Sequence, residues 1–342
     1  MDLTTRAPAP DGQADAGGPG GDGGRRPRRV VDVPTRTDRI FGASTTTAGL
    51  TVLALLTLTG LFLLLRSRDT FELMGWDFFT TVTWRADVDP PVIGVLGLVT
   101  GTVLVALVAV SIAIPLGCCT ALFITDYSSR RWRSLLTSLV DLLASIPSLL
   151  YGLWGFVMLA SQLVPVTEWL ARHVGWFPLF RTTGADPEYY GSIFIAGTVV
   201  SLMVLPIVAS VSREVFAQTP AGEKEAALAL GGTRWGMVRM VVLPYGRSGV
   251  IGGSMLGLGR ALGETIAVSL LLPQVPEVTG RILENGGATV SGFIAVSAGS
   301  GDPVQTSGLM AAGLVLFAMT LVTNVLASVI VARSRSGVGV EL

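Results

Sequence analysis

Long stretches without a charged side chain constrain the fold of this chain more than any other feature. Residues 40–65 form the first such run, 26 residues bounded by arginines, and residues 90–125 form the second, with 36 residues. A helix needs about 20 predominantly apolar residues to cross the hydrocarbon core of a bilayer. Because half of all residues are hydrophobic and the charges fall between such runs, the sequence predicts an all-α polytopic membrane protein.

Six uncharged or nearly uncharged runs are long enough to be membrane-spanning helices. The expected spans are residues 40–65, part of 90–125, about 135–159, 189–212, 248–275 and 303–332. Pro115 is expected to kink the second span, which helices in lipid tolerate. Aromatic residues in 66–89 favour a membrane interface or a short helix there. Residues 164–188 and 276–302 are predicted to be loops.

The two termini are predicted to lie on the same side of the membrane. Residues 1–39 are rich in Pro, Gly, Asp and Arg and are expected to form a disordered tail, since they cannot bury enough apolar surface to fold. Residues 40–335 then form the six-span domain, and residues 336–342 form a short second tail. Most basic residues lie in the tails and in the loops on their side, so the positive-inside rule places both termini in the cytoplasm.

The composition excludes several kinds of functional site. Cys118 and Cys119 are the only cysteines and His173 is the only histidine, so neither a His/Cys metal cluster nor a Ser-His-Asp triad can be assembled. No nucleophile with a partner base is visible, and we do not expect an enzyme. Lys plus Arg equals Asp plus Glu, and no nucleic-acid partner, metal or cofactor is predicted for this chain.

A charged, helix-forming segment, residues 219–244, separates the fourth and fifth expected spans. Thr219 is expected to be the N-cap of a helix with Pro220 at its first position, followed by Glu, Lys, Ala and Leu, which favour helix. The glycine pair that begins at Gly231 should end this helix. A second helical piece should end at Leu243-Pro244, because proline cannot continue the hydrogen-bond ladder. The segment is thus predicted to be two short helices joined by a turn on the cytoplasmic face.

The fifth expected span carries two charged side chains among its glycines. At about 100° per residue, Gly249, Gly253, Gly257, Arg260 and Glu264 fall within one helical face about 80° wide. Small residues on such a face let another helix approach closely. A charge at mid-bilayer costs roughly 2.5 to 3.5 kcal/mol on insertion scales, so this face must contact protein or water rather than lipid.

Two interpretations of the charged pair remain open. Arg260 and Glu264, four residues apart on a helix, would form an ion pair that locks two helices together. Alternatively, Arg260 lies on the route of a transported anion, with Glu264 orienting it and lowering its cost of desolvation. Arginine suits an oxyanion such as phosphate, because its planar guanidinium can donate to two oxygens at once.

The segment between spans four and five resembles the EAA loop of ABC importer permeases. The pattern is Glu225-Ala226-Ala227, three residues, Gly231, nine residues, Val241, one residue and Leu243-Pro244. This resemblance implies that the segment docks in a groove of a separate ATPase subunit and transmits its closure to the membrane helices. The sequence contains no G-x-x-x-x-G-K-S/T phosphate loop, so ATP and Mg²⁺ are expected on that partner subunit.

A second resemblance concerns the charged span. Residues 256–268, Leu-Gly-Leu-Gly-Arg-Ala-Leu-Gly-Glu-Thr-Ile-Ala-Val, are similar to the fifth-span signature of phosphate-specific transporter permeases, in the form found in their C-type subunit. Residues 146–155 and the Asp77-Phe-Phe motif before the second span agree with this family. The resemblance covers about residues 45–335 and implies the type I ABC importer permease (MetI-like) architecture in a bacterial cytoplasmic, or inner, membrane.

The family resemblance also implies partners and a substrate. The chain would pair with a homologous A-type permease subunit in the lipid bilayer to form a pathway for inorganic phosphate. Two cytoplasmic ATPase subunits and an extracytoplasmic phosphate-binding protein would complete the importer. Two alternatives remain. One is a permease of the same fold for another oxyanion, molybdate or sulfate, and the other is an ATP-independent secondary transporter or channel.

Overall fold

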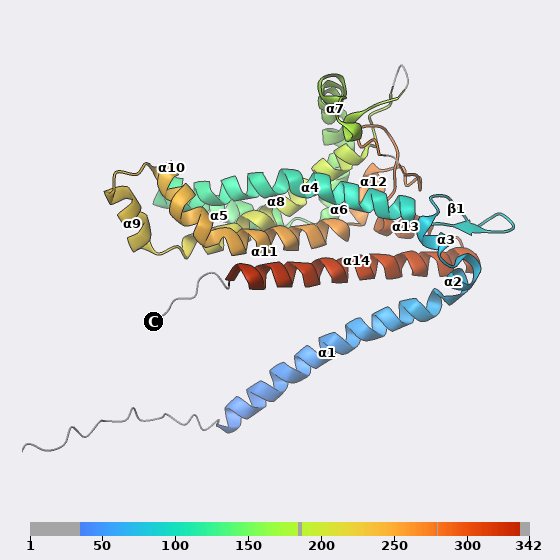
Figure 1. Cartoon of the computed structure of the whole chain (residues 1–342), viewed down its shortest axis with the longest axis horizontal. Helices are drawn as coiled ribbons and strands as arrows, with labels where there is room; N and C mark the ends of the chain where they lie inside the picture. Colours follow the sequence, from blue (N-terminus) through green and yellow to red (C-terminus); the bar gives the residue numbers. More distant parts are fainter. Residues whose placement is uncertain (1–34, 184–186, 279, 336–342) are drawn as a thin grey trace, which may run out of the picture. The chain divides into compact units, whose positions relative to one another are not determined.

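Helices make up most of the computed structural model (Figure 1). It describes residues 35–183, 187–278 and 280–335 of the 342-residue chain. The chain divides into two compact units, residues up to Leu55 and residues from Leu56 onward, and each is described by itself. Most of the predicted N-terminal tail and all of the predicted C-terminal tail lie outside the described residues.

Helix α1 (Arg36–Arg66) begins four residues before the expected start of the first span. The backbone N–H and the hydroxyl of Thr35 donate to the Asp38 carboxylate at 2.9 and 2.7 Å. The Asp38 N–H in turn donates to the Thr35 hydroxyl oxygen at 3.3 Å. This reciprocal capping satisfies donors that the first turn of a helix leaves free, and it explains why α1 starts at this point.

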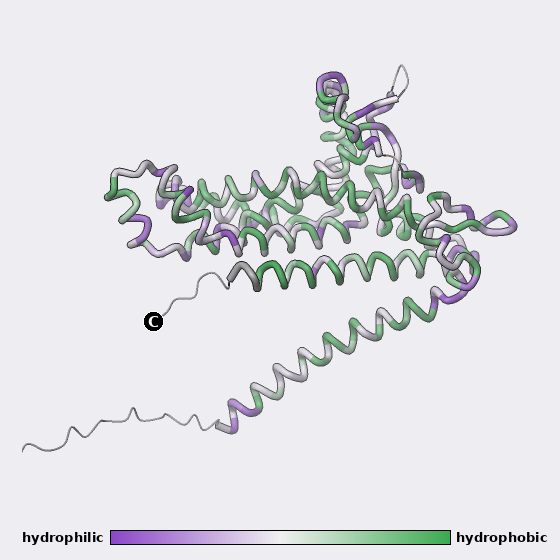
Figure 2. Tube along the Cα trace, in the orientation of Figure 1, coloured by the Kyte–Doolittle hydropathy of each residue, from purple (hydrophilic) through white to green (hydrophobic). Residues whose placement is uncertain are grey.

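Five helices in the described part of the chain are long and apolar enough to cross a membrane. They are α1, α4 (Leu96–Leu122) with its π-helical end η1 (Phe123–Tyr127), α6 (Ser148–Trp154) continuing through η2 (Gly155–Leu159) into α7 (Ala160–Val174), α8 (Ile193–Ala217) and α14 (Pro303–Arg335). In Figure 2, α4 and α14 are mainly hydrophobic along their length. The all-α membrane architecture is confirmed, but the count of six spans is not.

The third expected span, residues 135–159, is wrong in its boundaries. Helix α5 (Arg130–Ser145) ends where Pro147 follows Ile146, whose φ of −67° and ψ of 129° are extended, as the residue before a proline prefers. A new helix starts at Ser148 and continues to Val174, so the first part of the expected loop over 164–188 is helical. Hydropathy alone does not detect a turn between two apolar helices.

The fifth expected span, residues 248–275, is not a continuous helix. Helix α11 (Leu243–Leu262) ends at Gly263, and the short helix α12 (Ile266–Leu271) follows after a break at Glu264 and Thr265. The expected loop over 276–302 contains a further helix, α13 (Val290–Ser297), which packs against α12 and α14. The region predicted to be one span therefore contains two helices separated by a break.

Helix α8 is the most buried of the candidate spans, with 67% of its apolar window inside the protein. It packs against both α4 and α11, which lie beside it in Figure 1. Small residues permit this approach, because a Cβ on Gly197 would lie 2.6 Å from Val108 and one on Gly117 would lie 3.0 Å from Val208. The main hydrophobic core therefore forms around α8.

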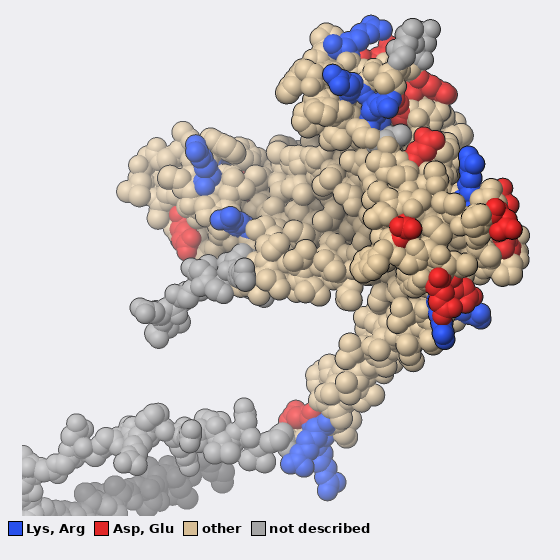
Figure 3. Space-filling view, turned by 45° about the vertical axis from the view of Figure 1, so that its right-hand side comes forward, with Lys and Arg blue, Asp and Glu red and all other residues tan. Residues whose placement is uncertain are grey.

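Two smaller cores close the ends of the unit that begins at Leu56. The elements at one end are α2 (Arg68–Met74), α3 (Asp77–Thr80) and two antiparallel strands, β1 (Trp84–Arg85) and β2 (Val92–Ile93), around Phe78. The elements at the other end are α9 (Ala221–Ala229), α10 (Arg234–Met237) and η4 (Val238–Val242), around Phe216. Figure 3 shows charged side chains toward these ends and at α7, and a broad uncharged surface between them.

Candidate functional site

The EAA segment folds as a short helix and a turn at one end of the bundle. Glu225 and Ala226 are exposed on α9, whereas Ala227 is buried in the core that contains Phe216. Gly231 follows α9 with a φ of +83°, a conformation that glycine adopts without strain. The predicted end of the first helix at Gly231 is therefore confirmed.

Two details of this segment differ from the prediction. Pro220 rather than Thr219 is the N-cap of α9, and within the described residues the buried Thr219 hydroxyl has no hydrogen-bond partner. The chain also does not break at Leu243-Pro244. Helix α10 continues through η4 into α11, whose first turn contains Pro244. Proline is tolerated in a first helical turn, and the wider π turn before it accommodates the missing N–H.

Apolar side chains are exposed around the EAA segment. Leu230 is 90% exposed, Met240 67% and Trp235 58%. Leu230 directly precedes Gly231, and Trp235 and Met240 lie between Gly231 and the partly buried Leu243. All three follow the exposed Glu225 in the sequence. An apolar surface of this kind, bordered by charged residues, is typical of a site that binds another protein.

The glycine face predicted for the fifth span is confirmed. Gly249, Gly253 and Gly257 each face a valine of α8. A Cβ on Gly257 would lie only 2.6 Å from Val204, closer than two carbon atoms can pack. The glycines therefore allow α11 to approach α8, as expected for small residues between membrane helices.

Glu264 does not share this face. Arg260 is exposed in the last turn of α11, whereas Glu264 is 8% exposed and lies beyond the end of the helix. The ion pairs between described residues do not include one between these two side chains. The angular prediction is wrong for Glu264, because the helix stops at Leu262. Arg260 keeps its helical position but is exposed, because packed helices cross and stay in contact over only part of their length.

Hydrogen bonds from α12 and α13 hold the break after α11. The Ala267 N–H donates to Glu264 Oε1 at 3.4 Å, and the Ser291 hydroxyl donates to the Glu264 carbonyl at 2.6 Å. The Gln274 side chain donates to the Val268 carbonyl at 3.2 Å, and Gln274 has a φ of 56°. Sequence reasoning missed Ser291 and Gln274, because neither belongs to a periodic pattern or a motif.

Tyr151 in α6 belongs to the stretch over residues 146–155 that resembles the phosphate-specific family. The Tyr151 hydroxyl donates to the Leu143 carbonyl at 2.9 Å. Helix α6 also approaches α12 closely, since a Cβ on Gly152 would lie 2.7 Å from the Cα of Ala267. Two stretches that separately resemble the phosphate-specific family therefore meet in space, and they present an exposed guanidinium that is able to bind an anion.

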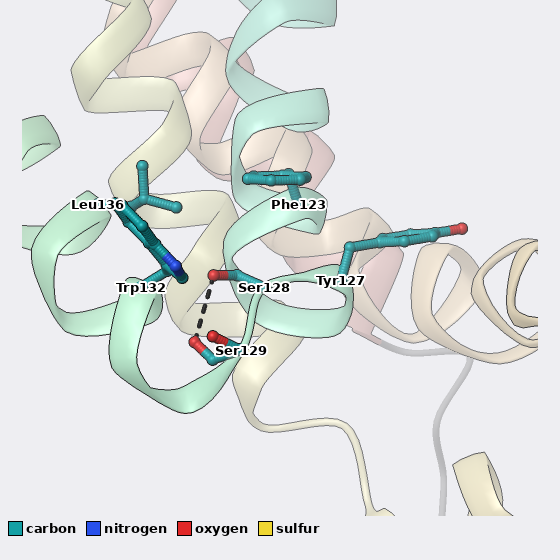
Figure 4. Close-up of a pocket in the computed structure, with 6 residues that line it drawn as sticks. All are labelled: Phe123, Tyr127, Ser128, Ser129, Trp132 and Leu136. Carbon is teal, nitrogen blue, oxygen red and sulfur yellow. Dashed lines mark hydrogen bonds between the residues drawn. The ribbon is translucent and has the colours of Figure 1, made fainter.

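A cavity of about 350 Å³ lies elsewhere, beside η1 and the start of α5 (Figure 4). Its lining residues are Phe123, Tyr127, Ser128, Ser129, Trp132 and Leu136. The lining is mainly apolar and contains no charged residue, so we do not assign an anion to it. In the ranges that the structure describes, no group of His, Cys, Asp and Glu could hold a metal ion.

The structure combines long apolar helices, an arginine beside a helix break and an exposed helical segment at one end. This combination is typical of a membrane transport component. Residues 113–336 match the family model described as binding-protein-dependent transport system inner membrane component. The chain belongs to this family.

Relatives of similar length support a narrower resemblance. The phosphate transport system permease protein PstC 2 of Mycobacterium tuberculosis is 41% identical over 304 residues, 88% of this chain and 94% of that protein. PstC of Mycobacterium leprae is 41% identical over 307 residues, 89% of this chain and 95% of that protein. PstC of Xylella fastidiosa is 37% identical over 302 residues, with coverage of 87% and 91%. The resemblance to the C-type permeases is therefore confirmed.

A solved structure supports the fold. The crystal structure of a bacterial ABC transporter involved in the import of the acidic polysaccharide alginate contains a chain with a TM-score of 0.50 to this one. The similarity covers 86% of this chain and 99% of that chain, at 17% sequence identity. This likeness concerns the arrangement of helices alone.

Proposed function

We propose that this chain is the membrane permease subunit of an ATP-driven importer of inorganic phosphate. The observation that carries the proposal is the 41% identity to PstC 2 of Mycobacterium tuberculosis over 88% of the chain. Arg260 provides a chemical reason for this substrate, because a guanidinium can donate two hydrogen bonds to one phosphate group. Glu264 contributes by shaping the break beside Arg260 rather than by pairing with it.

A homologous permease would complete the pathway. Large apolar side chains are exposed on α5 and α6, including Trp132 at 62%, Leu142 at 63% and Leu150 at 53%. Surface of this kind requires cover by lipid or by another protein. Pairing with an A-type permease subunit would cover part of it and would enclose the exposed Arg260 between two subunits.

Energy would come from two separate ATPase subunits that bind ATP and Mg²⁺. The exposed α9 segment supports this assignment, since Glu225 and the apolar side chains near it are available to a partner. Both termini then lie in the cytoplasm, and a phosphate-binding protein docks at the opposite side of the bacterial inner membrane. ATP-driven movement of α9 would alternate access to the site at Arg260.

Phosphate uptake in a strain deleted for this chain tests the proposal. The wild-type chain is expected to restore uptake, and Arg260→Gln is expected to lower it by about 10- to 100-fold, the loss of a charge-assisted hydrogen bond. Arg68→Gln is the matched control, because Arg68 on α2 and its ion-pair partner Glu72 are both exposed. Membrane insertion of each variant is checked by its abundance in the membrane fraction.

Each alternative has its own outcome in this experiment. Full uptake with Arg260→Gln would remove Arg260 from the pathway. A deletion strain that loses sulfate or molybdate uptake, and keeps phosphate uptake, would assign a different oxyanion. Transport by the chain alone, in vesicles without ATP, would identify a secondary transporter instead.

A further inference from the structure

An ion pair connects α9 to the end of the second candidate span. The Lys224 ammonium donates to the Asp126 carboxylate at 2.7 Å. Asp126 lies in η1, which ends the α4 span, and Lys224 directly precedes Glu225 of the EAA motif. Lys224 is also the only lysine of the chain. The two residues are 98 positions apart, so only the fold brings them together.

Both members of this pair are largely withdrawn from water. The exposed fraction of the side chain is 20% for Lys224 and 5% for Asp126, against 76% and 61% for the surface pair of Arg68 with Glu72. The Thr125 hydroxyl also donates to Asp126, at 2.8 Å. Exposed pairs contribute little, whereas removing one partner of a buried pair leaves an uncompensated charge.

Other polar contacts fix η1 in place. From α5, the Arg133 Nε donates to the Ile124 carbonyl at 3.0 Å, and its Nη2 donates to the Thr125 carbonyl. Figure 4 shows η1 leading directly into α5. The last turn of the span is thus bonded to α5 on one side and to α9 on the other.

The covalent chain already joins α9 to two other helices. It follows α8 directly, and it leads through α10 and η4 into α11. The ion pair adds α4 as a third helix. Because α4 packs against both α8 and α11, the pair closes a loop of contacts between the EAA segment and α11, the helix that ends before the break at Glu264.

We propose that Lys224 and Asp126 are positioning residues that transmit movement of α9 to the second span during transport. The inference rests on the proposed docking of α9 to an ATPase. A hydrogen-bonded ion pair fixes both the distance between the two side chains and their relative orientation. The apolar contacts of the core around Ala227 are not directional. When an ATPase displaces α9, Asp126 follows, and α4 carries the displacement to α8 and α11.

The test measures phosphate transported per ATP hydrolysed, by the complete importer with its binding protein in proteoliposomes. Lys224→Met and Asp126→Asn remove one charge each and are expected to lower this ratio by about tenfold, within the range of coupling between sites, while hydrolysis continues. The reversed pair, Lys224→Glu with Asp126→Lys, is expected to recover most of the ratio. Lys224→Arg, which keeps the charge, and Arg68→Met on α2 should leave the ratio unchanged.

Normalising to assembled complex separates coupling from folding. A purely structural pair predicts less assembled importer with an unchanged ratio, and that result overturns the inference. A reversed pair that assembles without recovering the ratio also overturns it. If the wild-type importer moves no phosphate, the proposed function fails together with the inference. Normal wild-type uptake with unchanged ratios in both single variants overturns the inference alone.

Discussion

Replacing Gly257 with alanine is expected to destabilise the protein through one contact. A Cβ at this position would lie 2.6 Å from Val204 Cγ1 and 3.2 Å from Val208 Cγ2. Val204 is fully buried, and a β-branched side chain has one strongly preferred rotamer in a helix, so it cannot turn away. Helices α8 and α11 must therefore move apart, or the valine must adopt a strained rotamer.

Gly252, on the same helix, provides a matched control. A Cβ there would meet its nearest neighbour, Val331, at 3.6 Å, an ordinary van der Waals distance. Alanine raises helix propensity by about 1 kcal/mol over glycine at either position, and this gain cancels when the two variants are compared. Overpacking a core typically costs about 1–3 kcal/mol. Gly257→Ala should therefore be less stable than Gly252→Ala by about this amount.

The assay is the free energy of unfolding of the purified chain in detergent, measured by denaturant titration with tryptophan fluorescence as the signal. Wild type, Gly252→Ala and Gly257→Ala are compared under one set of conditions. Equal stability of the two variants would refute the reasoning, since it would mean that α11 does not approach α8 through Gly257. A lower free energy of unfolding for Gly257→Ala alone would confirm the contact between Gly257 and Val204.

Two further predictions concern the EAA segment. Glu225→Lys should lower the phosphate transported per ATP hydrolysed while leaving the free energy of unfolding unchanged, because Glu225 is exposed; normal coupled uptake would count against docking at α9. Gly231→Ala should destabilise the chain by about 1–2 kcal/mol, because φ is +83° with no atom within 4 Å of a Cβ. In Gly222→Ala, on α9, the added Cβ would have no atom within 4 Å, so the free energy of unfolding should instead rise by up to about 1 kcal/mol. A change of the same sign in both variants would contradict the strain argument.

The sequence predicted the positions of the spans well where the length of an uncharged apolar run alone decides them. The helices α1, α4, α8 and α14 fall where the uncharged runs are long enough to cross a bilayer, because length and apolar composition are visible in the sequence. The third and fifth spans failed for a different reason. A break inside an apolar run depends on local backbone conformation at Ile146 and on hydrogen bonds to Glu264 from a helix that is distant in the chain.

The candidate site was predicted in part. The glycine face of α11 was found because small residues at helical spacing mark a packing surface directly. The close approach of Gly152 to Ala267 was not predicted, although both lie in stretches that resemble the phosphate-specific family. Neither periodicity nor motif spacing reports which face of one helix meets another, since that depends on where each helix ends and how the two cross.

The sequence by itself determined the class of this protein, its family and the segment available to a partner, because these follow from composition, run length and fixed motif spacing. Only the tertiary structure decided which side chains meet. It placed Glu264 beyond the end of the helix that carries Arg260, where a helical projection had put both on one face, and it joined Lys224 to Asp126 across 98 positions. The physical reason is that periodicity acts within one helix, whereas buried contacts arise between helices whose ends and crossings no local pattern specifies.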